Sequence, residues 1–410
     1  MELLTINNVW MMICTALVFI MHLGFSFLEI GLTRQKNTIN ILFKNFFVIT
    51  MGLISYCFIG FNLMYPGEWM IEGYLGAINT GLDSIVATDL AYNEGYTYWT
   101  DFLFQGMFAA TAATIISGAV AERIKINSFI LIAILYITIV YPIIGSWQWG
   151  GGFFSTFISD ELGFYDFAGS TIVHSVGGWG ALIVIYFLGA RKGKFDANGK
   201  PMAITGSNIP LSAAGVLILW LGWFGFNGGS VLSADPVSTS LTLVTTCLSA
   251  ASGGIGAAIF SRILYNNLDL TMFMNGILGG LVGITASADQ MLPSSAILIG
   301  LFSGVIVVLS VSLLDKFKLD DPVGAIPVHL FCGIWGTLAV GIFGQMASFD
   351  QFMVQLACVG IAGLFCIICA SIITLIVKTL VGLRVDEKEE LDGLDIAEHG
   401  TRAYGDFSIN

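Results

Sequence analysis

Charged residues are scarce in this sequence. Asp, Glu, Lys and Arg make up only 11% of the 410 residues, and 56% of the residues are hydrophobic. A soluble domain carries about 25% charged residues, so this composition is typical of a membrane protein. The formal net charge of -12 gives no reason to expect a nucleic-acid partner, because no basic patch faces outward.

The residue groups that support enzyme chemistry are missing as well. There is no HExxH-type metal motif, no phosphate-binding loop and no recognisable nucleophile. The seven cysteines lie inside apolar runs and show neither zinc spacing nor a disulfide framework, so we interpret them as small buried side chains; they are Cys14, Cys57, Cys247, Cys332, Cys358, Cys366 and Cys369. We therefore expect no enzyme activity, no metal site and no cofactor.

Long apolar runs are what the sequence has in abundance. About 20 apolar residues suffice to cross a hydrocarbon core of ~30 Å as a helix. The first run begins close to Met1 without a basic region before it or a cleavage site after it, so we expect it to be retained. Eleven runs are found, at 9–31, 45–65, 102–121, 127–146, 169–190, 209–229, 238–260, 272–288, 294–314, 323–345 and 352–383. The predicted fold is an all-α, polytopic membrane protein with eleven transmembrane helices.

Lysine and arginine are absent from every second connection between these runs. All sixteen basic residues fall in or beside the other connections, beginning with the one after the first helix. Basic residues in short loops stay on the cytoplasmic side of a membrane. The sequence therefore predicts a multi-pass protein of the cell (plasma or inner) membrane, with its N-terminus outside and its C-terminus inside.

One nine-residue pattern occurs twice. DFAGSTIVH, residues 166–174, and DPVGAIPVH, residues 321–329, share the form D-x-x-G-x-x-x-V-H. They open the fifth and tenth apolar runs and so hold corresponding places in two halves of five helices each. Because five is odd, the halves enter the membrane from opposite sides, which is the inverted-repeat arrangement of many transporters.

The repeat places two histidines near the middle of the membrane. We expect Asp166 and Asp321 to cap the N-termini of their helices. His174 and His329 follow eight residues later, roughly 12 Å along the helix, and should reach similar depths from opposite sides. Polar residues at the centre of a bilayer tend to mark a substrate path or a proton relay. A histidine pair without nearby carboxylates suits a small molecule that exchanges protons near neutral pH, such as ammonium.

The two other histidines have no counterpart in the repeat. His22 lies in the middle of the first apolar run, where we expect it to form a hydrogen bond between neighbouring helices. His399 lies in a polar tail, and we expect no transport role for it.

At these residues the chain resembles the ammonium transporter family, whose Amt, Mep and Rh branches share a trimeric fold of eleven helices. The resemblance spans nearly the whole chain, in order, spacing and topology. It is carried by LEIGLTRQKN (28–37), GAVAERIK (118–125), WGGG (149–152), DFAGSTIVH (166–174), WFGFNGGS (223–230) and DDPVGAIPVH (320–329).

The resemblance implies a role for each matched residue. It makes His174 and His329 the twin histidines of a narrow apolar pore, and it makes Phe108 and Phe226 a stacked phenylalanine gate. Phe104, Trp149 and Ser230 correspond to the outer recruitment site for ammonium, with Asp166 behind it in a structural and electrostatic role. Aromatic faces attract a cation, and the serine oxygen accepts a hydrogen bond that a bare alkali ion cannot donate.

Two positions beside His329 depart from the family pattern. Pro327 stands where a small or flexible residue is more usual, and Leu330 stands where glycine is common. Proline costs little in the first turns of a helix, but it can tilt the ring of His329. The connection from Trp149 to Asp166 is also longer than in the shorter bacterial members, which affects the shape of the outer vestibule.

These patterns divide the chain into two parts. Residues 1–383 form the predicted transmembrane domain, with repeat one at about 9–190, repeat two at about 209–345 and an eleventh helix at about 352–383. Residues 384–410 form a polar cytoplasmic tail of the Amt type. The resemblance implies a homotrimer in which this tail packs beneath a neighbouring subunit, and it makes a PII-type signal protein a candidate partner at the cytoplasmic face.

The leading hypothesis is ammonium transport, in which ammonium is recruited outside, deprotonated and conducted as ammonia past the histidines. Whether the proton follows by a separate path is open. One alternative is an ammonium sensor with little flux, although sensors usually carry a fused kinase or cyclase domain and only a polar tail follows the last apolar run here. The other is an Rh-like channel for a neutral gas, against which the cation-recruiting residues Trp149 and Ser230 argue.

Overall fold

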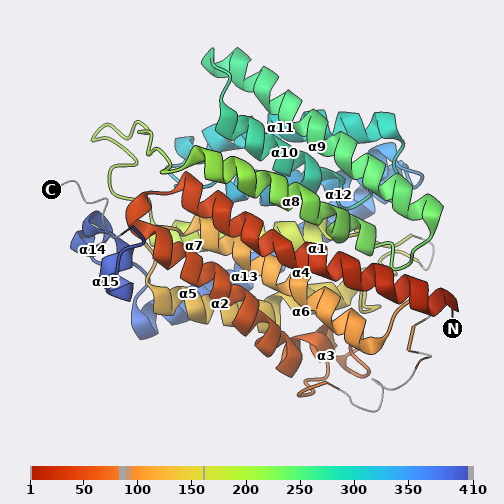
Figure 1. Ribbon diagram of the computed structural model, residues 1–410. Coiled ribbons are helices and arrows are strands. Elements are labelled where there is room, and N and C mark those ends of the chain that lie inside the picture. The colour runs from red at the N-terminus through yellow and green to blue at the C-terminus, as the bar shows by residue number, and fades with distance from the viewer. Residues whose placement is uncertain (1, 83–89, 91, 94, 160–161, 405–410) are drawn as a thin grey trace.

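The computed structural model describes residues 2–82, 90, 92–93, 95–159 and 162–404; residues 405–410 of the predicted tail therefore lie outside the described residues. It is a bundle of long helices that run side by side (Figure 1). The N-terminus lies at one end of the bundle, and the helices of the C-terminal tail lie at the opposite end (Figure 1). We call these the N-terminal end and the tail end.

The first half of the chain contributes five apolar helical segments. The first segment is α1 (Glu2–Leu32), and the third is α4 (Tyr98–Ala119). The second runs without a break through η1 (Gln35–Asn37), α2 (Thr38–Ser55), η2 (Tyr56–Gly60) and α3 (Phe61–Met64). The fourth consists of α5 (Ile126–Leu135), η4 (Tyr136–Val140) and α6 (Tyr141–Gln148), and the fifth consists of η5 (Ser170–Ser175) and α7 (Val176–Leu188). A small antiparallel hairpin, β1 (Trp69–Ile71) with β2 (Leu75–Gly76), follows α3.

The second half repeats this plan and adds a helix and the tail. It consists of α8 (Ile209–Gly229), α9 (Pro236–Tyr265), α10 (Leu270–Ile284), α11 (Pro293–Lys316), η6 (Ile326–Phe331) with α12 (Cys332–Phe343), α13 (Phe349–Val381), and the tail helices α14 (Glu387–Asp392) and α15 (Leu394–His399). Each of the eleven predicted apolar runs thus contains a helix.

Ten helical segments of the described chain are long and apolar enough to cross a membrane, and α10, at 15 residues, is shorter. The run predicted at 272–288 is helical only as far as Ile284 because the chain then turns to pair with the segment before η5. There Phe167 N–H donates to Ala286 O, Ala168 N–H donates to Thr285 O, and Ala286 N–H donates to Ser170 Oγ. The early end of α10 therefore helps to hold the start of the helix that carries His174.

Small residues let α1 and α8 approach closely. A Cβ atom added at Gly31 would lie 2.1 Å from Ser212 Oγ, and one added at Gly215 would lie 2.6 Å from Leu28 N. Close contact through small side chains is how helices pack in lipid, where burial of apolar surface gives little driving force. Large apolar side chains instead point outward on the long helices, as Ile263 on α9 and Leu364 on α13 do. The protein is a multi-pass membrane protein.

Candidate functional site

The two repeat histidines meet inside the bundle. The Nδ1 atoms of His174 and His329 lie 3.1 Å apart, a hydrogen-bonding distance. Their ring centroids are 5.1 Å apart with an interplanar angle of 23°, and both residues are buried. Only one of two facing ring nitrogens can donate in such a contact. The pair therefore holds one hydrogen between two nearly parallel imidazoles.

Each histidine lies in a π-helical turn, a feature that the sequence does not predict. His174 belongs to η5, where its N–H donates to Gly169 O five residues earlier at 3.0 Å. His329 belongs to the corresponding turn η6 of the other half. Single π-helical turns inside α-helices occur frequently at functional sites. The structure thus distorts the helix in the same way at both histidines.

The two repeat aspartates cap these turns, as predicted. Asp166 Oδ1 accepts hydrogen bonds from Gly169 N and Ser170 N, and its Oδ2 accepts from Thr171 N and Ile172 N, at 2.8 to 3.0 Å. Burial raises the pKa of Asp166 to about 6, and the four backbone N–H groups oppose that rise. The carboxylate is thus a deeply buried helix cap.

Asp321 caps the second turn with three bonds. Its Oδ1 accepts from Val323 N and Gly324 N, and its Oδ2 accepts from Ile326 N at 2.7 Å. The neighbouring Asp320 binds Arg191 at the tail end, whereas Asp166 is joined through its carbonyl to Trp149, which follows α6. The two histidine-bearing helices therefore start at opposite ends of the bundle, in agreement with an inverted repeat.

Phe226 connects the histidines to the predicted gate. Its ring centroid lies 4.1 Å from that of Phe108 and 5.2 Å from that of His174. Phe104 continues the row, 4.7 Å from Phe108. All three phenylalanines are buried. The predicted gate is thus in direct contact with the histidine pair on the side away from the tail.

Trp149 and Ser230 contact this row toward the N-terminal end of the bundle. The Trp149 ring lies 6.5 Å from Phe108 and almost perpendicular to it, and its Nε1–H donates to Asp166 O at 3.0 Å. Ser230 Oγ donates to Phe226 O at 2.8 Å, which leaves its lone pairs able to accept. Both residues are half-buried.

Two further aromatic residues in contact with the histidines were missed from the sequence. Trp223 is fully buried, stacks on His174 at 5.2 Å and 20°, and donates from Nε1 to Thr285 Oγ1. It precedes Phe226 by three residues and so shares its helix face, a signal that could have found it. Phe25 lies 6.1 Å from the ring of His329, and nothing in the local pattern of its helix singles it out.

Pro327 and Leu330, which depart from the family pattern, do not disrupt the contact between His174 and His329. Pro327 falls in the first positions of η6, where its missing N–H costs little, and the two histidine rings remain within 23° of parallel. Leu330 packs on the other half of the chain, where a Cβ atom at Gly178 would lie 2.7 Å from Leu330 N. Gly178 of α7 thus provides the space that Leu330 needs.

The prediction for His22 is wrong. Its ring is buried in α1, and within the described chain neither ring nitrogen has a hydrogen-bond partner. The predicted bond to a neighbouring helix is therefore not formed. His399 contacts the ring of Phe43 and the side-chain amide of Asn40 at the tail end. No group of three or more His, Cys, Asp or Glu side chains that could hold a metal ion occurs in the part of the chain that the structure describes.

A buried charge network holds the tail end of the bundle. Arg191 binds both oxygens of Asp320 and lies 3.4 Å from Glu122, which also binds Arg34. Burial alone would raise the pKa of Asp320, but the hydrogen bonds from Arg191 and the charge of Arg123 lower it to about 2. This carboxylate is therefore held in its charged form.

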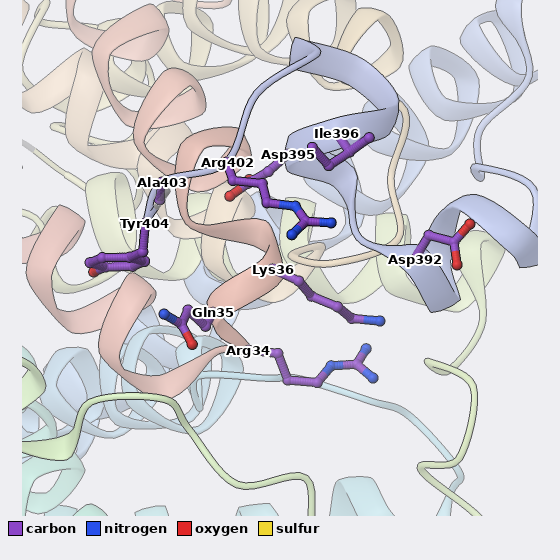
Figure 2. Close-up of a pocket in the computed structure, with 9 residues that line it drawn as sticks. All are labelled: Arg34, Gln35, Lys36, Asp392, Asp395, Ile396, Arg402, Ala403 and Tyr404. Atoms are coloured by element: carbon purple, nitrogen blue, oxygen red, sulfur yellow. The ribbon is translucent and has the colours of Figure 1, made fainter. Parts of the chain in front are cut away.

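The tail docks beside this network, on residues of its own chain. Lys36 Nζ donates to the last carbonyls of α14, those of Glu390 and Leu391. Asp395 Oδ1 accepts from Asn40 N at 2.9 Å. Figure 2 shows the cavity of about 390 Å³ that lies between these parts, with Arg34 and Lys36 on one side and Arg402 and Tyr404 of the tail on the other.

Comparison with known proteins shows the family of this chain. Residues 9–404 match the model of the Ammonium Transporter Family. The chain belongs to the ammonium transporter family. It is 42% identical over 410 residues to sll1017 of Synechocystis sp. (strain ATCC 27184 / PCC 6803 / Kazusa), which is provisionally named an ammonium transporter, with 98% of this chain and 89% of that protein covered. It is 38% identical to Ammonium transporter Amt2 of Archaeoglobus fulgidus, with 98% and 89% covered.

Solved structures of the family have the same fold. The structure titled "Sensor Amt Protein" superposes with a TM-score of 0.89 at 36% identity and covers 97% of this chain and 100% of that one. Mep2 of Saccharomyces cerevisiae superposes with a TM-score of 0.85 at 25% identity and covers 99% and 93%. The helical architecture is therefore that of the Amt and Mep proteins.

Proposed function

We propose that this member of the ammonium transporter family conducts ammonium across the membrane through a pore within each chain. One observation carries the proposal. His174 and His329 share a hydrogen-bonding contact of 3.1 Å directly behind two phenylalanine rings whose centroids are 4.1 Å apart. A buried imidazole pair behind an apolar constriction suits a substrate that loses its charge before it passes.

Recruitment takes place at the N-terminal end. Trp149 and Phe104 offer aromatic faces to the ammonium ion, an attraction worth about 0.5 to 2 kcal/mol and more when water is excluded. Ser230 accepts a hydrogen bond from the ion, which potassium cannot donate. This combination favours ammonium over alkali cations of similar size.

Deprotonation follows at the gate. Phe108 and Phe226 present apolar faces that cannot replace the hydration of an ion, so the neutral ammonia molecule passes them more easily than ammonium. Beyond the gate, the histidine pair offers ring nitrogens that exchange a hydrogen with ammonia or with each other. Asp166 fixes the first π-helical turn and adds negative charge behind the recruitment site.

The orientation and assembly of the chain belong to the same proposal. The basic connections lie at the tail end, so the tail end is cytoplasmic and the N-terminal end is extracytoplasmic, in the plasma or inner membrane. The chain acts as a homotrimer with one pore per subunit. The cytoplasmic face that carries the docked tail is the candidate site for a PII-type signal protein.

Growth rescue tests the proposal. The chain is expressed in a yeast strain that lacks its own ammonium permeases, and growth is measured on ammonium as the sole nitrogen source. We expect rescue by the natural chain and no rescue by a variant with alanine at both His174 and His329. Lack of rescue by the natural chain, when it is present in the plasma membrane, would contradict transport.

A second candidate function is ammonium sensing with little flux. It is favoured by the similarity to the structure titled "Sensor Amt Protein". Ammonium uptake by the purified protein in liposomes distinguishes the two functions, because a sensor binds ammonium without transporting it into the liposome. A neutral-gas channel is disfavoured, because it has no use for a cation site at Trp149 and Ser230.

A further inference from the structure

A small cavity lies directly beyond the histidine pair on the tail side. It has a volume of about 20 Å³ and is lined by His329, Phe25, Glu29, Thr114 and residues of α10 and η6. About 10 to 15 Å³ by this measure is enough for one water molecule, provided that two to four polar groups surround it. The cavity can therefore hold a single water or ammonia molecule.

Glu29 is the carboxylate in the wall of this cavity. It lies on α1, one turn from Phe25, and it is only 2% exposed. Asn45 Nδ2 and Ser117 Oγ donate to it at 3.1 and 3.0 Å, and both bonds go to Oε2. In the described part of the chain no hydrogen bond to Oε1 is found, so this oxygen is available to the cavity.

A buried lysine balances the charge of Glu29. Lys44 is fully buried, and its Nζ donates to Ser117 O at 2.8 Å, while the hydroxyl of the same serine donates to Glu29. A lone carboxylate in an apolar interior is costly, and an opposite charge with hydrogen bonds reduces that cost. Lys44 thus permits a group that gains and loses a proton to stay inside the bundle.

Two more features show that the cavity is suited to a polar guest. Thr114 Oγ1 is buried and lacks a hydrogen-bond partner among the described residues, although Thr114 lines the cavity. A Cβ atom at Gly118 would lie 3.5 Å from the carboxyl carbon of Glu29 and 2.6 Å from Val323 Cγ2. The unpaired hydroxyl therefore offers a hydrogen-bonding group in the cavity, and the absent side chain of Gly118 lets Val323 and Glu29 lie close to α4 at its wall.

We infer that Glu29 is the inner proton site of the pore, which takes a proton from the histidine pair and returns it to ammonia. Nδ1 of His329 is hydrogen-bonded to Nδ1 of His174, so Nε2 is the ring nitrogen of His329 that can transfer a proton toward the cavity. The proton leaves Nε2 for the cavity water, and the water gives a proton to Glu29. Ammonia then replaces the water, takes the proton from the carboxyl group and leaves as ammonium. No proton is gained or lost overall, and the translocated species is ammonium.

This inference rests on the proposed function, and the test separates the two. The trimer, reconstituted in liposomes, is assayed both for methylammonium uptake and for ammonium-evoked current. Absence of uptake would refute the proposed function. Uptake without any current would leave the proposed function standing and overturn the proton site, because ammonia would then cross alone.

Variants of Glu29 decide the role when both signals are present. Glu29→Gln keeps the shape of the side chain but removes the acid, and we expect the current to fall at least ten-fold. Glu29→Asp keeps a carboxylate and should retain a substantial part of the current. A current in Glu29→Gln equal to that of the natural chain would overturn the inference.

A double variant separates proton transfer from charge balance. Glu29→Gln leaves Lys44 without its counter-charge, which can disturb the fold, so Glu29→Gln is combined with Lys44→Met. We expect this pair to restore thermal stability and still to lack current. Recovery of the current would show that Glu29 only balances Lys44, and would overturn the inference.

Two threonine variants serve as a matched pair on α4. Thr114→Val removes the hydroxyl group that lines the cavity, and we expect a several-fold loss of current. Thr111→Val removes a buried hydroxyl one turn away that is bonded to Met107 O, and the current should be unchanged. Equal effects of the two substitutions would count against a guest in the cavity.

Discussion

The Nδ1 atoms of His174 and His329 face each other at 3.1 Å, although 155 residues separate them in the chain. This relationship leaves the two Nε2 atoms at the outer ends of the pair. Nε2 of His174 is buried and has no hydrogen-bond partner among the described residues. A proton that crosses the pair must therefore enter and leave through the Nε2 positions.

Asparagine at either histidine tests this geometry. His329→Asn and His174→Asn each keep a polar atom close to the place of Nδ1 but lack Nε2. We expect each variant, like the corresponding alanine variant, to lose at least ten-fold of the ammonium-evoked current in proteoliposomes. His399→Ala, in the tail, is the control and should behave as the natural chain. A full current in both asparagine variants would show that the Nε2 atoms carry no proton.

Substitution of Trp149 should weaken recruitment. A cation over an aromatic face gains about 0.5 to 2 kcal/mol, which corresponds to roughly a 2- to 30-fold change in affinity. We expect Trp149→Ala to raise the half-saturating ammonium concentration within this range and Trp149→Phe to raise it less. Trp99→Ala removes a half-exposed ring in the first turn of α4 and should have no effect. An unchanged half-saturation in Trp149→Ala would contradict the proposed recruitment site.

The buried ion pair of Asp320 with Arg191 predicts an acid-dependent loss of stability. The folded state lowers the pKa of Asp320 from 3.8 to about 2, which corresponds to about 2 kcal/mol. A lowered folded-state pKa stabilises the protein above pH 4, and this contribution disappears as the pH falls toward 2. We expect Asp320→Asn to lower the melting temperature at pH 7 and the difference from the natural chain to shrink between pH 4 and 2.

The surface pair of Lys194 with Asp315 provides the control for that experiment. Its atoms are 2.8 Å apart, but both side chains are partly exposed, and exposed pairs contribute about 0 to 1 kcal/mol. Asp315→Asn should change the melting temperature little at any pH. If both variants lose the same stability at pH 7, burial does not strengthen the pair of Asp320.

Docking of the tail can be tested with two aspartates of the same segment. Asp395→Ala removes the acceptor of Asn40 N, and we expect limited proteolysis to cleave the tail several-fold faster. Asp392 is exposed on α14, and Asp392→Ala should leave the rate of cleavage unchanged. Equal rates in the natural chain and in Asp395→Ala would show that this hydrogen bond does not hold the tail.

The sequence predicts the parts of the site that repeat or that follow local rules. The matching positions of His174 and His329 were visible because a pattern recurs in two apolar runs, and Asp166 was predictable because a helix start favours a carboxylate. Each of these inferences needs only neighbouring residues. The helices themselves were predictable because a membrane segment must satisfy its own backbone hydrogen bonds.

The rest depends on contacts between distant segments. Trp223 reaches His174 only after α8 packs against the bundle, and α10 ends early because Thr285 and Ala286 bond to residues more than a hundred positions away. Glu29 lies in the LEIGLTRQKN motif at 28–37, yet its neighbours Asn45 and Ser117 come from other helices. Local patterns contain no signal for such arrangements.

The π-helical turns give the chain a strict dependence on length near each histidine. In an α-helix one residue corresponds to about 100° of rotation, since 3.6 residues complete a turn. A deletion of one residue between Gly169 and His174 would turn the imidazole to another face of its helix, even if every neighbouring side chain were kept. The proposed proton path therefore depends on the spacing from aspartate to histidine, which is eight residues in both halves, and insertions or deletions there should be tolerated less than substitutions.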